Sequence, residues 1–263
     1  MNRSIALLAA LALAVASAAT AQSPLPRPAA KAAAPLSAEA QAVRKLVLER
    51  FPGADIRHIA KTAYAGLYEV MFDDQMIYVD PRVDYVFVGS VYDAKTKTNL
   101  TERKSRELNR VAWGDLPLDL AIKKVKGTGA RKLAVFSDAD CPFCARLEET
   151  LKGVDDVTIY TFLYPIDQLH PDAARKSRLI WCAPDRVKAW DEFFASGKLP
   201  DNAGTCDTPI AATAALGQKL KVTATPTLVF ADGSVVPGAL PAANLEAELV
   251  RAETEARKTA SAR

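Results

Sequence analysis

The sequence has a small net charge, few histidines, and no apolar run as long as a membrane-spanning helix. Its 34 lysines and arginines against 31 acidic residues give a net charge of +3, and the two signs are interspersed, so we expect neither nucleic acid nor an anionic membrane as a partner. Beyond the N-terminus no stretch approaches the ~20 apolar residues of a membrane-spanning helix, so we expect a soluble mature chain. With His58 and His170 as its two histidines, the chain offers few ligands for a metal site.

Residues 1–21 have the order of parts found in a secretory signal peptide. Arg3 gives a positive start, an apolar run from Ile5 to Ala16 follows, and Ala19-Thr20-Ala21 offers small residues at the positions that a signal peptidase reads. The apolar run is too short for a membrane anchor. We therefore expect cleavage and export, which places the cysteines where disulfides persist.

The first part of the expected mature chain has the pattern of a small α+β domain. Residues 22–36 are rich in proline and alanine and predict a leader without folded elements. Ser37 can then cap a helix that Pro52-Gly53 stops, and short strand-like runs with a turn at Asp73-Asp74 predict an antiparallel sheet within residues 37–98. A domain this short would gain from association with a second copy. The expected strands cover residues 55–60, 67–72, 75–79 and 85–92.

The second part has the pattern of a thioredoxin scaffold. Residues 99–117 are charged and predict a linker helix, and residues 259–263 predict a frayed tail. Between them, residues 118–258 read as strand, helix, strand, further helices, and then two strands and a helix, which is the thioredoxin order with a helical insertion. The expected strands are 132–136, 157–163, 227–230 and 234–236, and the expected helices follow Cys144 and cover 171–182, 185–195, 209–220 and 240–257.

The motif Cys141-Pro142-Phe143-Cys144 lies between an expected strand and an expected helix. The free N–H groups and the dipole at a helix N-terminus favour a thiolate at Cys141, and the thiolate is the nucleophile of disulfide exchange. Cys144 lies one turn later and can attack a mixed disulfide on Cys141. Pro142 suits the first turn of a helix, and Phe143 offers an apolar surface to an unfolded substrate. The motif predicts thiol–disulfide exchange.

Two other roles compete for this cysteine pair. A zinc site needs a second pair of ligands at matching spacing, and the other two cysteines have 23 residues between them, so we predict no metal. A purely structural Cys141–Cys144 disulfide is the second alternative. The strand and helix around the motif favour a catalytic pair over both.

Cys182 and Cys206 have a different setting. Cys182 ends an apolar helical stretch, and Cys206 lies in a loop rich in Gly, Asp and Asn. A bridge between them would close a loop of about 25 residues, which stabilises a protein by roughly 3–4 kcal/mol in the chain-entropy model. We predict a permanent structural disulfide, and a second redox relay is the alternative.

Thr225-Pro226 precedes an expected strand. In a thioredoxin scaffold the proline at this place faces the cysteine pair and is cis, and the residue before it presents its backbone to an extended substrate. We therefore predict that Thr225 and Pro226 bind substrate.

Several further segments of the sequence occur in an order that is found in one family of proteins. They are residues 136–144 around the cysteine motif, 169–173, 181–182, 225–227 and 237–238, with 87–89 and 116–118 ahead of them. With this ordered set the chain resembles the DsbC and DsbG family of periplasmic thiol:disulfide interchange proteins over nearly all of its expected mature length.

The resemblance implies a periplasmic homodimer without a cofactor. The N-terminal domain would be a cystatin-like dimerisation module, and two thioredoxin-like domains would face one cleft. Cys141 would attack, Cys144 would resolve, and Cys182 and Cys206 would form the family's structural bridge. The substrates would be misfolded or wrongly disulfide-bonded periplasmic proteins, and a membrane electron donor of the DsbD type would keep Cys141 reduced.

The motif departs from both branches of the family. DsbC usually carries Gly-Tyr between its cysteines and DsbG carries Pro-Tyr, whereas this chain has Pro142-Phe143, and Ala145 stands where DsbC-like enzymes often have histidine. We expect a disulfide isomerase or reductase. A DsbG-like reductase of sulfenylated cysteines, a holdase chaperone and a disulfide-donating oxidase are the alternatives.

Overall fold

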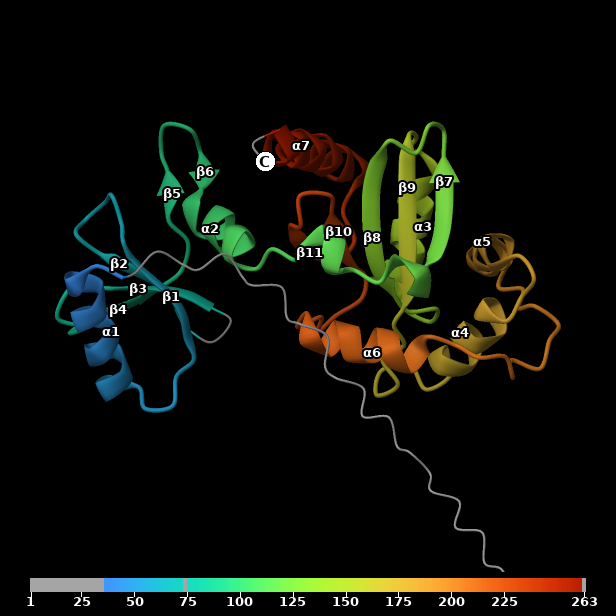
Figure 1. The fold of residues 1–263 in the computed structure, drawn as a ribbon, viewed down its shortest axis with the longest axis horizontal. Coiled ribbons are helices and arrows are strands. Elements are labelled where there is room, and N and C mark those ends of the chain that lie inside the picture. The colour runs from blue at the N-terminus through green and yellow to red at the C-terminus, as the bar shows by residue number, and fades with distance from the viewer. Residues whose placement is uncertain (1–35, 73–74, 262–263) are drawn as a thin grey trace, which may run out of the picture.

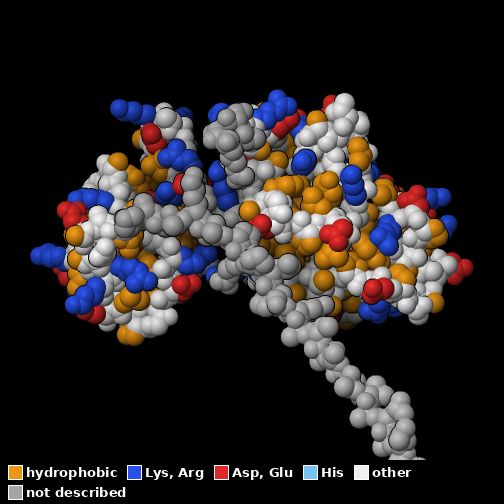
Figure 2. Space-filling view, in the orientation of Figure 1, with side chains coloured by type: hydrophobic (Ala, Val, Ile, Leu, Met, Phe, Trp, Pro, Cys, Tyr) orange, Lys and Arg blue, Asp and Glu red, His pale blue; other side chains and the backbone are white. Residues whose placement is uncertain are grey.

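The protein has two lobes joined by a helical connection (Figure 1). The computed structural model describes residues 36–72 and 75–261. The predicted signal peptide, the leader up to residue 35, the turn at Asp73-Asp74 and residues 262–263 lie outside the described residues. In Figure 2, basic and acidic side chains are interspersed over the visible face of both lobes.

The N-terminal lobe is a helix packed on an antiparallel sheet, as the sequence predicts. The hydroxyl of Ser37 accepts a hydrogen bond from Ala40 N–H at 3.2 Å, so the helix begins where the capping residue places it. Val43 and Val47 of this helix pack against Val70 and Val79 of the sheet. The elements are α1 (Ala38–Arg50), β1 (Ile56–Lys61), β2 (Tyr68–Phe72), β3 (Gln75–Val79) and β4 (Val86–Val88), in the sheet order β1-β2-β3-β4.

The single strand predicted over residues 85–92 is wrong, because the chain changes direction after Val88. Gly89 has a φ of +152°, a backbone conformation that other residues rarely adopt. The chain then leaves β3 and forms a separate two-stranded ribbon of β5 (Tyr92–Asp93) and β6 (Thr98–Asn99). The hydroxyl of Thr101 anchors the start of this ribbon by accepting a hydrogen bond from Val91 N–H at 2.8 Å.

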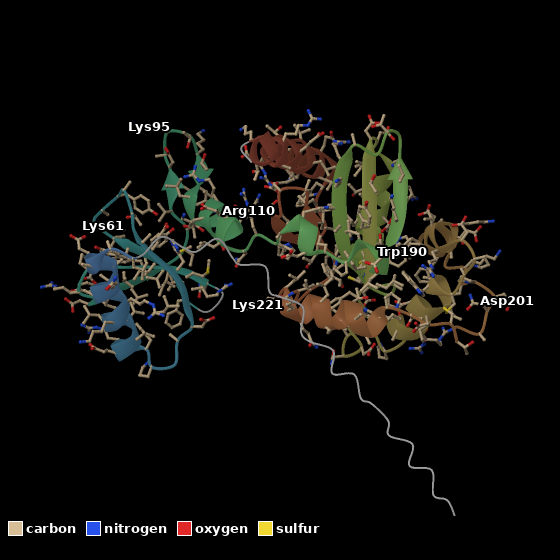
Figure 3. All side chains as sticks on the ribbon, in the orientation of Figure 1. Lys61, Lys95, Arg110, Trp190, Asp201 and Lys221 are labelled. Atoms are coloured by element: carbon tan, nitrogen blue, oxygen red, sulfur yellow. A yellow bond between two sulfur atoms is a disulfide. The ribbon has the colours of Figure 1, made fainter. Side chains whose placement is uncertain are left out.

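The linker helix predicted over residues 99–117 is too long: the connection between the lobes begins with helix α2 (Leu100–Leu108), which ends there. Asn99 caps it by accepting a hydrogen bond from Glu102 N–H at 3.0 Å. Arg106 of α2 reaches Glu248 on the last helix at 2.5 Å, and Val111 N–H donates to the carbonyl of Gly233 at 2.8 Å. Arg110 lies at this junction (Figure 3). Two short 3₁₀ turns, η1 (Trp113–Asp115) and η2 (Leu118–Leu120), lead into the larger lobe.

The larger lobe has a five-stranded sheet with helices on both faces, which confirms the predicted thioredoxin-like architecture. The sheet order is β11-β10-β8-β9-β7, with β8 and β9 parallel and the other neighbours antiparallel. The strands are β7 (Ile122–Lys126), β8 (Arg131–Ser137), β9 (Val157–Leu163), β10 (Thr227–Phe230) and β11 (Val235–Pro237), and the helices are α3 (Pro142–Lys152), α4 (Ala173–Trp181), α5 (Arg186–Ser196), α6 (Ile210–Lys219) and α7 (Ala242–Ser261).

Two elements differ from the sequence prediction. Strand β7 is not predicted from the sequence, because three lysines among its five residues mask the apolar pattern of a strand. Its pairing with β9 holds it in the sheet. Helix α7 continues to Ser261, so the tail predicted to fray from residue 259 is helical up to that residue. Pairs of opposite charge one turn apart, such as Arg257 with Glu253 and Lys258 with Glu255, support its last turns.

Helices α3 and α7 cover one face of this sheet, and α6 lies on the other. Leu147 of α3 and Leu245 of α7 join one core cluster with β8, β9 and β10. On the opposite face, Phe136 stacks on Phe162 with ring centroids 5.0 Å apart, and Leu216 of α6 packs against the same cluster. The cysteine motif follows the end of β8, and its last three residues begin α3.

Gly217 lets helix α6 approach Tyr164. A Cβ atom at this position would lie 2.2 Å from Cε2 of the Tyr164 ring. The ring cannot swing away easily, because its hydroxyl donates to the carbonyl of Val222 at 3.1 Å and its edge packs on Phe136. Helix α6 of the insertion therefore packs against Tyr164 so closely that residue 217 has no room for a side chain.

We expect Gly217→Ala to lower the free energy of unfolding by about 1–3 kcal/mol, because overpacking outweighs the ~1 kcal/mol that alanine gains over glycine in a helix. Chemical denaturation monitored by circular dichroism measures the change. Gly114→Ala is the control, since nothing lies within 4 Å of a Cβ built there. Equal stabilities for the two variants would contradict the close contact.

Candidate active site

Cys141 lies at the N-terminus of α3, directly after the strand that the sequence predicts. Cys141 is the N-cap residue of α3, and Pro142 occupies the first turn. The carbonyl of Cys141 accepts the N–H of Ala145 at 3.1 Å, while its side chain makes no capping hydrogen bond. Cys141 therefore lies at the end of α3 where the helix dipole and N–H groups without intrahelical partners favour negative charge. Cys141 is buried, with 5% of its surface exposed, and the motif's two cysteines are not bonded to each other.

The loop that ends in Thr225-Pro226 faces this sulfur. The peptide bond between the two residues is cis. The thiol of Cys141 donates to the carbonyl of Thr225 at 3.3 Å, across 84 residues of sequence. Pro226 is held in place because its carbonyl accepts the N–H of Gly238 at 2.7 Å. The structure thus brings together Cys141, Cys144, Thr225 and Pro226.

Cys144 is buried beneath Cys141 and is electrostatically different from a free thiol. It is fully buried, and its sulfur accepts the N–H of Asp138 at 3.4 Å. Burial raises the pKa of the Cys144 thiol to about 12, with the neighbouring Cys141 adding to the rise, while contacts with Ser137 and the Asp138 amide act in the opposite direction. Cys144 therefore stays a thiol at neutral pH until a reaction partner draws its proton.

Pro142 and Phe143 form the exposed rim of the site. The Phe143 ring is 52% exposed although it is large and apolar, and the guanidinium of Arg146 lies 5.2 Å from its centroid. An exposed aromatic ring beside a reactive sulfur offers contact area to an apolar segment of another protein.

Asp138 and His170 belong to the site, and sequence reasoning missed their contact. The carboxylate of Asp138 is fully buried and lies 3.0 Å from Nδ1 of His170. The sequence pattern around His170 predicts no catalytic role for it. Both residues follow the carboxyl ends of β8 and β9, which are parallel neighbours, so the strand pattern contained a signal for their proximity.

A second charged pair fastens the loop before Cys141 to the helical insertion. Asp140 pairs with Lys176 of α4, which also lies 3.6 Å from Asp172. The ammonium of Lys176 is 5.8 Å from the ring centroid of Phe193 on α5. The loop before Cys141 is therefore fixed by an ion pair with α4 as well as by its connection to the sheet.

Cys182 and Cys206 form a disulfide outside this cluster. Their Cα atoms are 5.6 Å apart, and the bond ties the end of α4 to the loop before α6. The neighbouring Trp181 donates its indole N–H to the carbonyl of Asp207 at 3.2 Å and stacks under Arg186. Among the described residues, no group of three or more His, Cys, Asp and Glu is arranged to hold a metal ion.

Glu148 is a partly buried acid on the helix that begins at the active site. It lies on α3 one turn after Cys144 and accepts the indole N–H of Trp190 at 2.9 Å. Burial raises the pKa of Glu148 to about 7, against the lowering effects of Trp190 and of Lys124. Its charge therefore changes near neutral pH.

The chain matches known proteins in both lobes. Residues 118–253 match the thioredoxin-like domain family, and residues 29–102 match the N-terminal domain family of disulfide bond isomerase proteins. The probable thiol:disulfide interchange protein DsbC of Bordetella parapertussis is 43% identical over 211 residues, which cover 80% of this chain and 74% of the relative. The chain belongs to the DsbC family of thiol:disulfide interchange proteins. The resemblance seen in the sequence and the predicted enzyme class are confirmed.

More distant members and a solved structure agree. The DsbC of Escherichia coli is 28% identical over 182 residues, covering 67% of this chain and 74% of that protein. A disulfide interchange protein from Neisseria gonorrhoeae of known crystal structure is 48% identical, with a TM-score of 0.51 over 52% of this chain and 99% of that one. In the described part of this DsbC-family chain, no helix is both long and apolar enough to cross a membrane.

We expect Glu148→Gln to stabilise the protein by about 1–3 kcal/mol at pH 8 and to leave its stability nearly unchanged at pH 5. The raised pKa means that the folded state binds the proton of Glu148 more tightly than the unfolded state, so the native acid costs stability as pH rises from about 4.5 to about 7. Urea unfolding at both pH values measures this. Glu149→Gln is the matched control, because the neighbouring side chain is exposed. A gain at pH 5 equal to that at pH 8 would contradict the assignment.

Proposed function

We propose that the protein is a periplasmic disulfide isomerase and reductase in which Cys141 attacks and Cys144 resolves. The observation that carries this proposal is a cysteine at a helix N-terminus whose sulfur lies 3.3 Å from the carbonyl oxygen of Thr225 in the cis-proline loop, in the same motif as a second, fully buried thiol. The predicted signal peptide over residues 1–21 supports the periplasmic location.

The first step is attack on a substrate disulfide. The Cys141 thiolate bonds to one substrate sulfur, the substrate S–S bond breaks, and the other sulfur leaves as a thiolate. The backbone of Thr225 and the ring of Phe143 flank the place where the bonded substrate segment lies. The helix N-terminus that stabilised the Cys141 thiolate also makes Cys141 a good leaving group in the next step.

Two steps can then release the substrate. In isomerisation, another substrate thiolate attacks the substrate sulfur of the mixed disulfide, and Cys141 leaves unchanged in oxidation state. In reduction, Cys144 loses its proton and attacks Cys141, so the substrate leaves with two electrons more and the enzyme holds a Cys141–Cys144 disulfide. The raised pKa of Cys144 slows this second route and leaves time for the first.

The oxidised enzyme needs a dithiol to return two electrons. A membrane electron donor of the DsbD type is the partner that we propose for this step. The exposed Pro142 and Phe143 at the rim of the site would contact either partner, since a donor and a substrate must reach the same Cys141 sulfur.

Cysteine variants test the assignment of roles. Cys144→Ser should accumulate a mixed disulfide with scrambled substrate, whereas Cys141→Ser should form none and should lose refolding activity by about a hundredfold or more, because its hydroxyl is a poor nucleophile. Non-reducing electrophoresis and refolding of a scrambled protein give the two measurements. Retained refolding by Cys141→Ser would favour a holdase, and faster disulfide formation in a reduced substrate than rearrangement would favour an oxidase.

The free edge of β4 supports association of two copies. In the described part of the chain, β4 pairs with β3 on one side and with no strand on the other. Its side chains Val86, Phe87 and Val88 are exposed, as is the preceding Tyr85, and Val88 is 65% exposed. An uncovered apolar edge strand readily pairs with another strand. We propose that the same edge of a second copy covers it and forms a homodimer.

We expect Val88→Lys to convert the dimer to a monomer, since two lysines would then meet in one interface. Sedimentation velocity at micromolar concentration measures the mass. Refolding of a scrambled protein should fall about tenfold while reduction of a small disulfide changes less than about twofold, because the Cys141 chemistry is intact. Val125→Lys is the control on β7, the edge of the other sheet, where the side chain is 55% exposed. A monomeric native protein, or a dimer that survives Val88→Lys, would refute this interface.

A further inference from the structure

The backbone of Asp138 contacts both active-site cysteines. Its N–H donates to the sulfur of Cys144 at 3.4 Å, and its carbonyl accepts the N–H of Cys141 at 3.2 Å. Asp138 lies directly after β8, three residues before Cys141. A change at Asp138 is therefore felt directly at the sulfur of Cys144 and at the backbone of Cys141.

The side chain of Asp138 is a fully buried carboxylate held by N–H donors. One oxygen accepts the N–H of Asp140 at 2.8 Å. The other accepts the N–H of Ile166 at 2.8 Å and lies 3.0 Å from Nδ1 of His170. A buried carboxylate is costly unless such donors offset the loss of water. The two amides are fixed by the backbone, so the ring of His170 is the donor that a substitution can remove.

Backbone hydrogen bonds hold the segment that carries His170 in the position of this contact. It follows β9, and the carbonyl of Ile166 accepts the N–H groups of Leu169 and His170 at 2.8 and 2.9 Å. Since Ile166 also donates to Asp138, the turn from residue 166 to residue 170 is attached to the carboxylate at both ends. The His170 ring is held over Asp138 and is 20% exposed at the surface of the site.

Electrostatics links this pair to the reaction. In the reduced enzyme, negative charge develops on sulfur, and a carboxylate nearby opposes it. A donor that draws the negative charge of Asp138 toward itself weakens that opposition. Since a stabilised thiolate favours the dithiol over the disulfide, the donor also shifts the equilibrium of the cysteine pair toward the reduced form.

We propose that His170 is a positioning residue that sets the reduction potential of the Cys141/Cys144 pair by holding the buried carboxylate of Asp138. It acts through Asp138 and touches neither sulfur. This role is independent of whether isomerisation or reduction dominates, because both begin from the reduced pair.

The test is the equilibrium of the enzyme with glutathione. One glutathione disulfide oxidises the Cys141/Cys144 dithiol to its disulfide and yields two glutathione thiols, so electrons and protons balance. We expect His170→Leu to raise the equilibrium constant for enzyme oxidation about tenfold, which corresponds to a potential about 30 mV more negative. Mass spectrometry of alkylated peptides scores these two cysteines separately from Cys182 and Cys206.

The chain supplies a matched control in its other histidine. His58 of β1 is also 20% exposed and lies 3.0 Å from a carboxylate oxygen, that of Glu69, in the N-terminal lobe. We expect His58→Leu to leave the constant within about twofold of the native value, because electrostatic effects decline with distance. An equal shift in both variants, or no shift in His170→Leu, would overturn the proposal.

Two further variants separate electrostatics from a loss of structure. His170→Asn keeps an N–H donor at the place of Nδ1, so its constant should lie nearer to the native value than that of His170→Leu. In an Asp138→Asn background, which removes the charge, His170→Leu should move the constant by less than about twofold. The same tenfold shift in both backgrounds would show that His170 supports only the fold. If His170→Leu does not fold, the asparagine variants at the two positions carry the test.

Discussion

The thiol of Cys141 lies 3.3 Å from the carbonyl oxygen of Thr225, and this approach joins the two halves of the thioredoxin-like lobe at one point. The helix that begins after Cys141 supplies an electropositive N-terminus, and the cis-proline loop supplies a backbone against which another chain can lie. The strands β8 and β10, which deliver these two segments, are hydrogen-bonded neighbours, so the sheet itself fixes the approach. The burial of Cys144 and the carboxylate of Asp138 then adjust the chemistry at a sulfur that is already in place.

The two cysteines divide the chemistry by burial. Cys141 keeps a little exposed surface and accepts a substrate, whereas Cys144 is enclosed and its thiol is hard to ionise. An enzyme that resolves its mixed disulfides too quickly would reduce every substrate and would seldom rearrange one. Enclosure of Cys144 therefore affects the balance of outcomes, whereas the helix N-terminus affects the rate of the first attack.

Much of this arrangement could be predicted from local sequence. Val157–Leu163 was predicted with its observed bounds, because a run of β-branched and aromatic residues between polar segments suits a buried strand. The motif at Cys141, the cis bond before Pro226 and the pairing of Cys182 with Cys206 also had sequence signals. These features depend on residues that are near in sequence or on a known scaffold.

Other features could not be predicted from local sequence, because most of them depend on which strands become neighbours in the sheet. The contact of Asp138 with His170 joins residues 32 positions apart and exists because β8 and β9 run parallel. Strand β7 is rich in lysine and is recognisable only through its pairing with β9. The break after Val88 follows from the backbone of Gly89, which a run of apolar residues concealed.

The two sheets expose edges of opposite character. Strand β7 carries Lys123, Lys124 and Lys126, and lysines on an edge strand discourage another strand from pairing there. The edge at β4 has no such protection and presents Phe87 and Val88. A contact that uses the same edge on both partners consumes that edge in both, so growth stops at two chains and cannot continue into a fibre. The proposed contact between two β4 edges would thus give a closed assembly, with two reactive sulfurs in every particle.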